Sequence, residues 1–232
     1  MRKVDPLIEL QQLDLALDRA RERRHQVVEA MKHREDLDAA AAALAEAERD
    51  LRRWEGEQRE LELELGRLTA KKEADEARLY AGTVRNPKEL EGLAKEVEQQ
   101  KALVSRCEDR LLACYDEVER ARRLVRQQQE AYARAETAWR TRQEALGAER
   151  DQLHREIRDL EARRAALVAR ADPASLRVYE HLRSTKGGIA VVPVHQRTCQ
   201  GCRISLPVSE EHRARSSRDL VTCQSCGRIL YA

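Results

Sequence analysis

Apolar side chains recur every seven residues along most of this chain, a spacing that lets one helix pack along another. A weaker companion series starts at Leu93 and includes Cys107 and Cys114. The pattern predicts one helix over about residues 87–171 with a continuous apolar stripe. The main series is apolar at every position: Leu90, Val97, Val104, Leu111, Val118, Val125, Tyr132, Trp139, Leu146, Leu153, Leu160 and Leu167.

The first part of the chain carries the same periodicity with one interruption. Two seams run through residues 6–78, and their phase shifts between Met31 and Leu37. Such a shift alters the local supercoil. The sequence therefore predicts a long helix with an irregularity at this point. The seam positions are Leu10, Leu13, Leu17, Ala20, Val27, Met31, Leu37, Ala40, Leu44, Ala47, Leu51, Trp54, Leu61, Leu65 and Leu68.

A short break at about residues 79–87 separates the two helices. Gly82 permits a turn, and Asn86 followed by Pro87 is typical of a helix start. Two helices of similar length with so short a connection should fold back on each other and hide both stripes. The alternative is that both extend and pair with another molecule. We expect the intramolecular antiparallel hairpin over residues 1–171.

The heptads end at residue 171. Asp172 and Pro173 predict the start of a short helix, and Gly187 with Gly188 predicts its end. Residues 172–188 are thus a short helix and linker. The extended apolar run that follows opens a separate module over residues 189–232.

That module holds two cysteine pairs, Cys199 with Cys202 and Cys223 with Cys226, each separated by two residues. One tight turn can direct both thiolates of such a pair at one ion, so the spacing indicates zinc. Four thiolates fill the coordination shell and leave no place for substrate, which predicts one structural Zn²⁺. His195 is an alternative ligand. The predicted fold class is mostly α, a long antiparallel coiled-coil helical hairpin with a small C-terminal zinc ribbon of short strands.

Composition agrees with this interpretation. Charged residues make up 37% of the chain and aromatic residues 3%, a profile typical of long helices. The sequence lacks an apolar run long enough for a membrane span and an apolar leader, so we expect a cytoplasmic protein without membrane association. Reduced cytoplasmic thiols favour metal binding over disulfides. We interpret Cys107 and Cys114 as small core residues, since a ligand pair there would need further donors.

Candidate chemistry beyond zinc is sparse. The sequence contains no phosphate-binding glycine loop, HExxH or GxSxG motif, so we expect no enzyme activity and no small-molecule substrate. The net charge of +2 does not indicate a general nucleic-acid binder. The ribbon is mildly basic, and its arginines are candidate contacts for nucleic acid or a partner. These are Arg197, Arg203, Arg213, Arg215, Arg218 and Arg228.

The chain resembles the bacterial family of coiled-coil hairpin proteins with a C-terminal C4-type zinc ribbon. The resemblance rests on the turn from Leu79 to Leu90, on the four cysteines with their flanking residues, and on the run from Leu10 to Asp14. It implies zinc ligation by the four ribbon cysteines and a non-enzymatic role. Some relatives are linked to the sigma factor sigma-54, to flagellar gene control and to RNA binding.

Two functional hypotheses follow. In the first, the protein is an adaptor that binds a protein partner, such as a sigma factor or polymerase component, with its rod and ribbon. In the second, the ribbon arginines bind RNA or DNA, which predicts affinity that falls steeply with salt. We further expect Cys223→Ser to unfold the ribbon and leave the helical rod.

Overall fold

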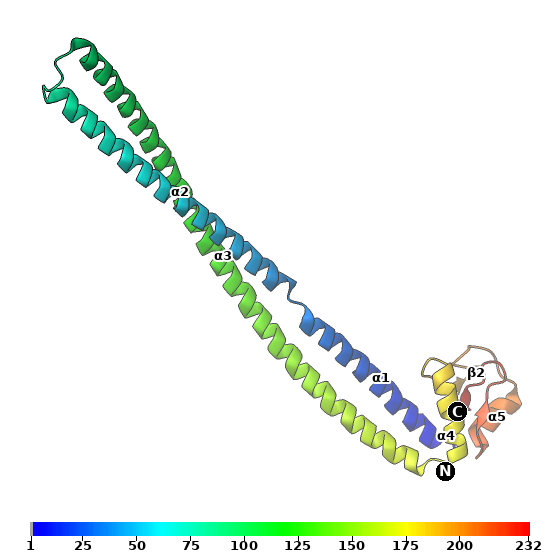
Figure 1. Ribbon diagram of the computed structural model, residues 1–232. Helices are drawn as coiled ribbons and strands as arrows, with labels where there is room; N and C mark the ends of the chain where they lie inside the picture. The colour runs from blue at the N-terminus through cyan, green and yellow to red at the C-terminus, as the bar shows by residue number, and fades with distance from the viewer. Residues whose placement is uncertain (1) are drawn as a thin grey trace. The chain divides into compact units, whose positions relative to one another are not determined.

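The computed structural model describes residues 2–232 (Figure 1). The chain divides into two compact units, one formed by residues up to His33 together with 143–232, the other by 34–142. A mostly α architecture with a small strand region is confirmed. The helices are α1 (Asp5–Lys32), α2 (Glu35–Tyr80), α3 (Pro87–Arg170), α4 (Pro173–Thr185) and α5 (Val208–Ser216). The strands are β1 (Val191–His195), β2 (Thr198–Cys199), β3 (Val221–Thr222) and β4 (Ile229–Tyr231). No helix of residues 2–232 combines the length and apolarity needed to cross a membrane.

The expected single helix over residues 6–78 is wrong at one point, because the chain breaks between α1 and α2. His33 is extended, with φ −71° and ψ 117°, and Arg34 has φ −140°. Met31 and Leu37 are six residues apart instead of seven. In a continuous helix, that missing residue would rotate the apolar seam by about 100°. Because one helix ends and another starts here, each helix buries its own seam.

The unit of residues 34–142 is an antiparallel pair made by α2 and the first part of α3, joined by the turn near Gly82 (Figure 1). Asn86 caps α3 by accepting a hydrogen bond from the Lys88 amide at 3.0 Å, as predicted. Cys107 and Cys114 are buried here, and burial raises the pKa of both thiols. The core cluster consists of Leu61, Cys107, Leu111, Cys114 and Val118, with Leu51, Trp54, Leu65 and Leu68 packed against it.

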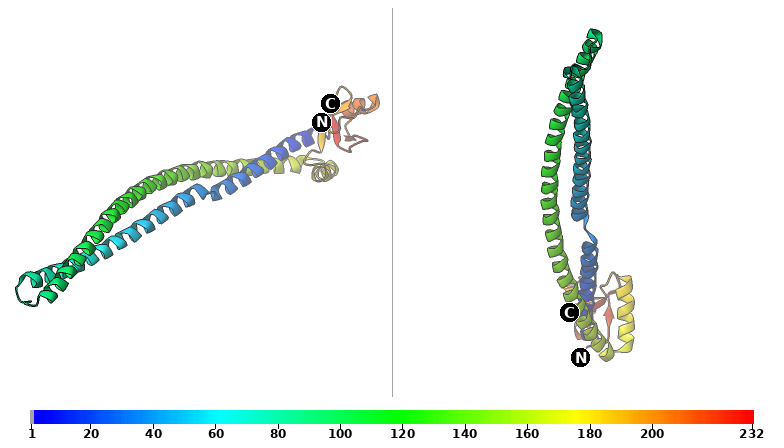
Figure 2. Two further views of the ribbon diagram at one scale, coloured as in Figure 1. Left: turned by 90° about the horizontal axis from the view of Figure 1, so that it is seen from above. Right: turned by 60° about the vertical axis from the view of Figure 1, so that its left-hand side comes forward.

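In the other unit, α1 packs against the last part of α3 (Figure 2). Most of its seam positions are buried as the heptads predict, and Ile157 joins them between Leu153 and Leu160. Met31, Leu146 and Leu167 are partly buried at the edge of the cluster. Exposed pairs such as Arg23–Glu149, at 2.6 Å, flank the seam. Such pairs contribute little to stability, so burial holds these helices together. The cluster consists of Leu13, Leu17, Ala20, Val27, Leu153, Ile157 and Leu160.

The same unit contains α4 and the small sheet. Asp172 caps α4 by accepting a hydrogen bond from the Ser175 amide at 2.9 Å, as its sequence position predicts. The sheet has the order β2-β1-β4-β3, and the central pair, β1 and β4, is parallel. Helix α5 was not expected from the sequence. Its nine residues pack on β3 and β4 through Ala214, too short a stretch to show a helical period.

Candidate metal centre

Two similar backbone turns carry the four cysteines. The Arg203 amide donates to the Cys199 carbonyl at 2.7 Å, and the Gly227 amide donates to the Cys223 carbonyl at 2.8 Å. The residue after each pair is left-handed, with φ 62° at Arg203 and 76° at Gly227. Glycine adopts this conformation freely, whereas Arg203 does so at a cost. The glycine at position 227 indicates the second turn in the sequence, whereas the arginine at position 203 gives no such indication of the first.

The sulfur geometry fits one tetrahedral zinc ion. All four ligand atoms lie within 4.8 Å of one another. The Sγ atoms of Cys199 and Cys226 are 3.9 Å apart, and those of Cys202 and Cys223 are 3.8 Å apart. A Zn–S bond of about 2.3 Å implies sulfur separations of about 3.8 Å in a tetrahedron. The residues therefore fit a structural zinc ion held by Cys199, Cys202, Cys223 and Cys226.

Electrostatics also favour a cation among these thiols. Burial raises the pKa of Cys199 to about 12 and raises that of Cys223. For Cys226 burial acts in the same direction, but the Arg228 amide and the neighbouring thiols lower its pKa to about 7. Four thiolates this close would repel one another without a dication. Zinc binding should thus release protons and weaken as the pH falls. His195 lies exposed at the end of β1 and is not in the cysteine group.

Arg228 braces the first cysteine turn from within the ribbon. Its guanidinium donates to the carbonyls of Ile189 at 2.9 Å, Lys186 at 3.2 Å and Gly201 at 3.4 Å. Gly201 is needed because a Cβ there would lie 2.9 Å from Arg228 Cδ and 3.1 Å from Val192 Cγ1. The support of this turn therefore depends on a close approach between a glycine and a restrained arginine.

Gly201→Ala should destabilise the ribbon by about 1–3 kcal/mol, because Arg228 cannot move aside without losing hydrogen bonds. Thermal unfolding of the zinc-loaded protein measures the effect. Gly147→Ala is the control, since a Cβ at this α3 position meets nothing within 4 Å. It should stabilise the helix by about 0.5–1 kcal/mol. Equal effects of the two changes would show that the contact with Arg228 is unimportant.

The other candidate arginines lie on the ribbon surface. Arg197 occupies the tight turn between β1 and β2 with φ 58°, next to Gln196 with φ 48°. Arg213, Arg215 and Arg218 are exposed on α5 and the loop after it. Arg215 forms a 3.7 Å ion pair with Glu211. The structure thus places five exposed arginines on the ribbon, while Arg228 is engaged internally.

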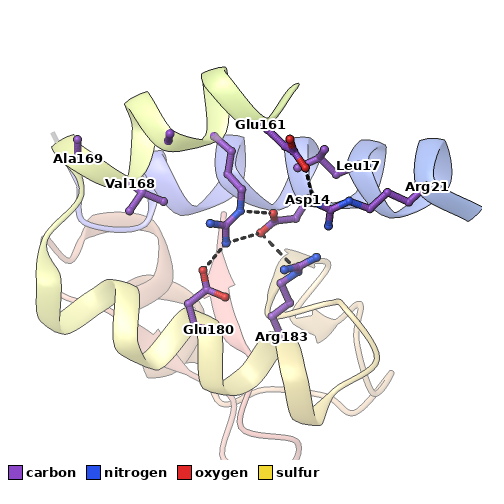
Figure 3. A pocket seen from close by; sticks show the side chains of 10 residues that line it. Asp14, Leu17, Arg21, Glu161, Val168, Ala169, Glu180 and Arg183 are labelled. Atoms are coloured by element: carbon purple, nitrogen blue, oxygen red, sulfur yellow. Dashed lines mark hydrogen bonds and ion pairs between the residues drawn. The ribbon is translucent and has the colours of Figure 1, made fainter. Parts of the chain in front are cut away.

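A polar cluster that the sequence analysis did not predict surrounds Asp14 in the first half of α1 (Figure 3). The Asp14 side chain is buried and accepts hydrogen bonds from Tyr179 Oη at 2.7 Å and Arg164 Nε at 2.6 Å. Arg183 Nε lies 3.4 Å from the same carboxylate. The cluster joins α1, α3 and α4. The sequence could have indicated this cluster, because Asp14 directly follows the seam residue Leu13 and a buried charge needs a partner.

A hollow of about 690 Å³ opens beside this cluster. Its charged walls neutralise one another, since Arg164 also pairs with Glu180, Arg183 with Asp18, and Arg21 with Glu161. Hydrogen bonding to Asp14, opposed by burial, raises the pKa of Arg164. These mutually paired side chains hold three helices together and offer no unpaired charge for a ligand. We therefore assign the cluster a structural role.

Comparisons with known proteins agree with this architecture. Residues 10–187 match the model of the CT398-like coiled coil hairpin domain, and residues 198–230 match that of the C4-type zinc ribbon domain. No curated protein matches the sequence significantly. The matches confirm the expected family and are consistent with one structural zinc ion.

Solved structures share the fold. The structure of CT398 from Chlamydia trachomatis has a TM-score of 0.78 at 22% identity, covering 99% of this chain and 97% of that one. A structure from Mycobacterium smegmatis has a TM-score of 0.68 at 22% identity, covering 100% of both chains. The HP0958 protein from Helicobacter pylori has a TM-score of 0.50 at 20% identity, with coverages of 99% and 97%. At these identities the likeness concerns the fold alone.

Proposed function

The chain belongs to the family of CT398-like coiled coil hairpin proteins, and from this premise we propose that it is a non-enzymatic adaptor that binds a protein partner in the cytoplasm. The observation that carries the proposal is the closed set of four thiolates at the end of long paired helices. Such a set leaves no coordination position for substrate, so the zinc supplies structure instead of chemistry. The hollow beside Asp14 has mutually paired charges and offers no alternative reaction centre.

The partner we propose is a component of the transcription apparatus, a sigma factor or polymerase subunit. The family resemblance supports this choice. The exposed helix surfaces carry charges of both signs, for example Arg67 and Glu73 on α2. Charges arranged in this way suit selective and reversible protein contacts.

Affinity purification of the zinc-loaded protein from its host, with and without nuclease, tests the adaptor proposal. A sigma factor or polymerase subunit that survives nuclease and binds the purified protein directly is the expected result. Mass spectrometry identifies the partner, and calorimetry measures the direct interaction. Loss of every protein after nuclease, with RNA recovered from the untreated sample, would contradict the adaptor role.

One observation favours nucleic-acid binding by the ribbon as a second candidate. Arg197 and Arg203 are both exposed and left-handed. Neither forms an ion pair or side-chain hydrogen bond with residues 2–232. A residue that adopts a costly backbone conformation while its charged side chain has no partner is a candidate for a functional contact. Arg213 and Arg218 add exposed positive charge nearby in the sequence.

Arg203→Gly tests whether Arg203 contacts nucleic acid. The glycine should adopt φ 62° without strain and stabilise the ribbon by about 1 kcal/mol. If Arg203 contacts phosphate, RNA affinity should fall and the salt dependence should weaken by about one charge. Fluorescence anisotropy over a salt series measures both. Arg203→Lys keeps the charge and should retain most of the affinity. Unchanged RNA binding by Arg203→Gly would remove this residue from the interface.

A further inference from the structure

The two central strands face two different cores. Val192 and Leu230 lie in a cluster with Cys199 and Cys223. Their neighbours Val191 and Ile229 belong to a different cluster, because successive side chains of a strand point to opposite faces. That second cluster consists of Val4, Leu7, Leu10, Tyr179, Leu182, Ala190, Val191 and Ile229. Strands β1 and β4 thus lie between the cysteines on one face and the apolar side chains of α1 and α4 on the other.

Gln11 of α1 attaches to the backbone at the start of β1. Its Oε1 accepts hydrogen bonds from the amides of Ala190 at 2.7 Å and Val191 at 2.6 Å. Its Nε2 donates to the Val191 carbonyl at 2.6 Å. The side-chain amide therefore pairs with the strand as another strand would. Such directional bonds require β1 to be folded and in one position.

The residues before α1 contact the other end of the ribbon. The Lys3 amide donates to the Arg218 carbonyl at 3.1 Å, and Lys3 Nζ pairs with Asp219 at 2.9 Å. Arg2 donates to the carbonyl of Ala232 at 3.0 Å. The N-terminal segment is thereby held at three places in the ribbon, in addition to the apolar cluster.

These contacts depend on strands that the chain alone supports poorly. The strands β2 and β3 have two residues each, and β4 has three. A module this small depends on its metal for folding energy. Without zinc, the backbone that receives Gln11 would lose its position. Ala190, Val191 and Ile229, the ribbon side chains that cover Leu7 and Leu10 together with α4, would be lost as well. Leu7, Leu10 and Gln11 all lie in α1, far from the cysteines in sequence.

We propose that zinc in the four-cysteine site controls the docking of residues 2–11, so that the ribbon is a metal-dependent clasp on the N-terminal end of α1. Loss of zinc opens the clasp and exposes the faces of Val4, Leu7 and Leu10 that the ribbon side chains cover. Rebinding closes it. Metal occupancy thereby becomes coupled to the exposure of apolar side chains at the start of α1.

Hydrogen exchange of the full chain, before and after zinc removal with a chelator, tests this directly. Peptides covering residues 4–11 and 189–231 should both lose at least about tenfold protection, and zinc should restore it. Peptides covering residues 104–125 belong to the other compact unit and should not change. Loss confined to residues 189–231, with residues 4–11 still protected, would overturn the proposal.

Linkage supplies a reciprocal test, because coupling between two sites acts equally in both directions. Gln11→Ala should weaken zinc binding by about tenfold, measured by competition with a chromophoric chelator. Gln26→Ala is the matched control, since this exposed side chain bonds only to Glu22 of its own helix. Unchanged zinc affinity in Gln11→Ala contradicts the clasp. If that variant fails to fold, the exchange measurement on the unaltered chain decides.

Discussion

Cys223→Ser is expected to abolish stoichiometric zinc binding and to unfold the ribbon. Zinc contributes about 10–16 kcal/mol of apparent binding energy to comparable small sites, more than a sheet of two- and three-residue strands can replace. The serine leaves three thiolates, and Cys223 is among the most deeply buried side chains. Metal analysis of the purified protein and near-ultraviolet circular dichroism measure the two effects.

Cys107→Ser is a matched control for this experiment. Cys107 is equally buried, but it packs with Leu61 and Leu111 in the other compact unit, and its Sγ lies 3.7 Å from the Leu61 carbonyl. The serine can donate to that carbonyl, so the variant should keep one zinc ion per chain. Full zinc content in Cys223→Ser, or zinc loss in Cys107→Ser, would show that the ligands are misassigned.

The shared core also changes the sequence-based expectation that Cys223→Ser leaves the helical rod intact. The helix pair of residues 34–142 has its own apolar cluster and should persist. Val4, Leu7, Leu10 and Gln11 contact β1 and β4, so residues 4–11 should lose their order together with the ribbon. Far-ultraviolet circular dichroism should therefore show a small loss of helix with most of the signal retained.

Asp14→Ala is expected to destabilise the unit that contains α1 and α4 by about 3–5 kcal/mol. The change removes a buried carboxylate. Three groups lose this partner: the guanidinium groups of Arg164 and Arg183 and the hydroxyl of Tyr179. Arg164 keeps its pair with Glu180 and Arg183 keeps its pair with Asp18, but both lose the one carboxylate that is fully buried. A hydrogen bond to a charged group contributes about 1.5–3 kcal/mol, and a buried hydroxyl left without an acceptor costs about 1–3 kcal/mol. Burial and the Asp14 hydrogen bond raise the pKa of Tyr179, so this hydroxyl stays protonated and needs an acceptor. Urea denaturation measures the loss.

Asp18→Ala tests whether burial causes that loss. Asp18 pairs with the same Arg183 at 2.9 Å, but its side chain is 46% exposed. Water can replace an exposed partner, so the cost should be at most about 1 kcal/mol. Similar destabilisation by both substitutions would mean that the position of Asp14 between three helices has no special effect on stability.

The sequence by itself determined the features that depend on repetition or local spacing. Heptads from Leu90 to Leu167 predicted α3 because a helix repeats its faces regularly. Asn86 and Asp172 predicted helix starts because a capping side chain contacts backbone only two or three residues away. The cysteine pairs predicted the metal centre because each turn is made by consecutive residues.

Only the tertiary structure decided what depends on residues distant in sequence. The burial of Asp14 depends on Arg164, Tyr179 and Arg183, which lie at least 150 residues away. Gln11 fits the start of β1 because folding brings together positions 179 and 180 residues apart. Polar side chains carry no periodic signal of such partners, since a surface glutamine and a buried one look alike in a sequence. Apolar periodicity specifies which face of a helix is covered, and the assembled core specifies what covers it.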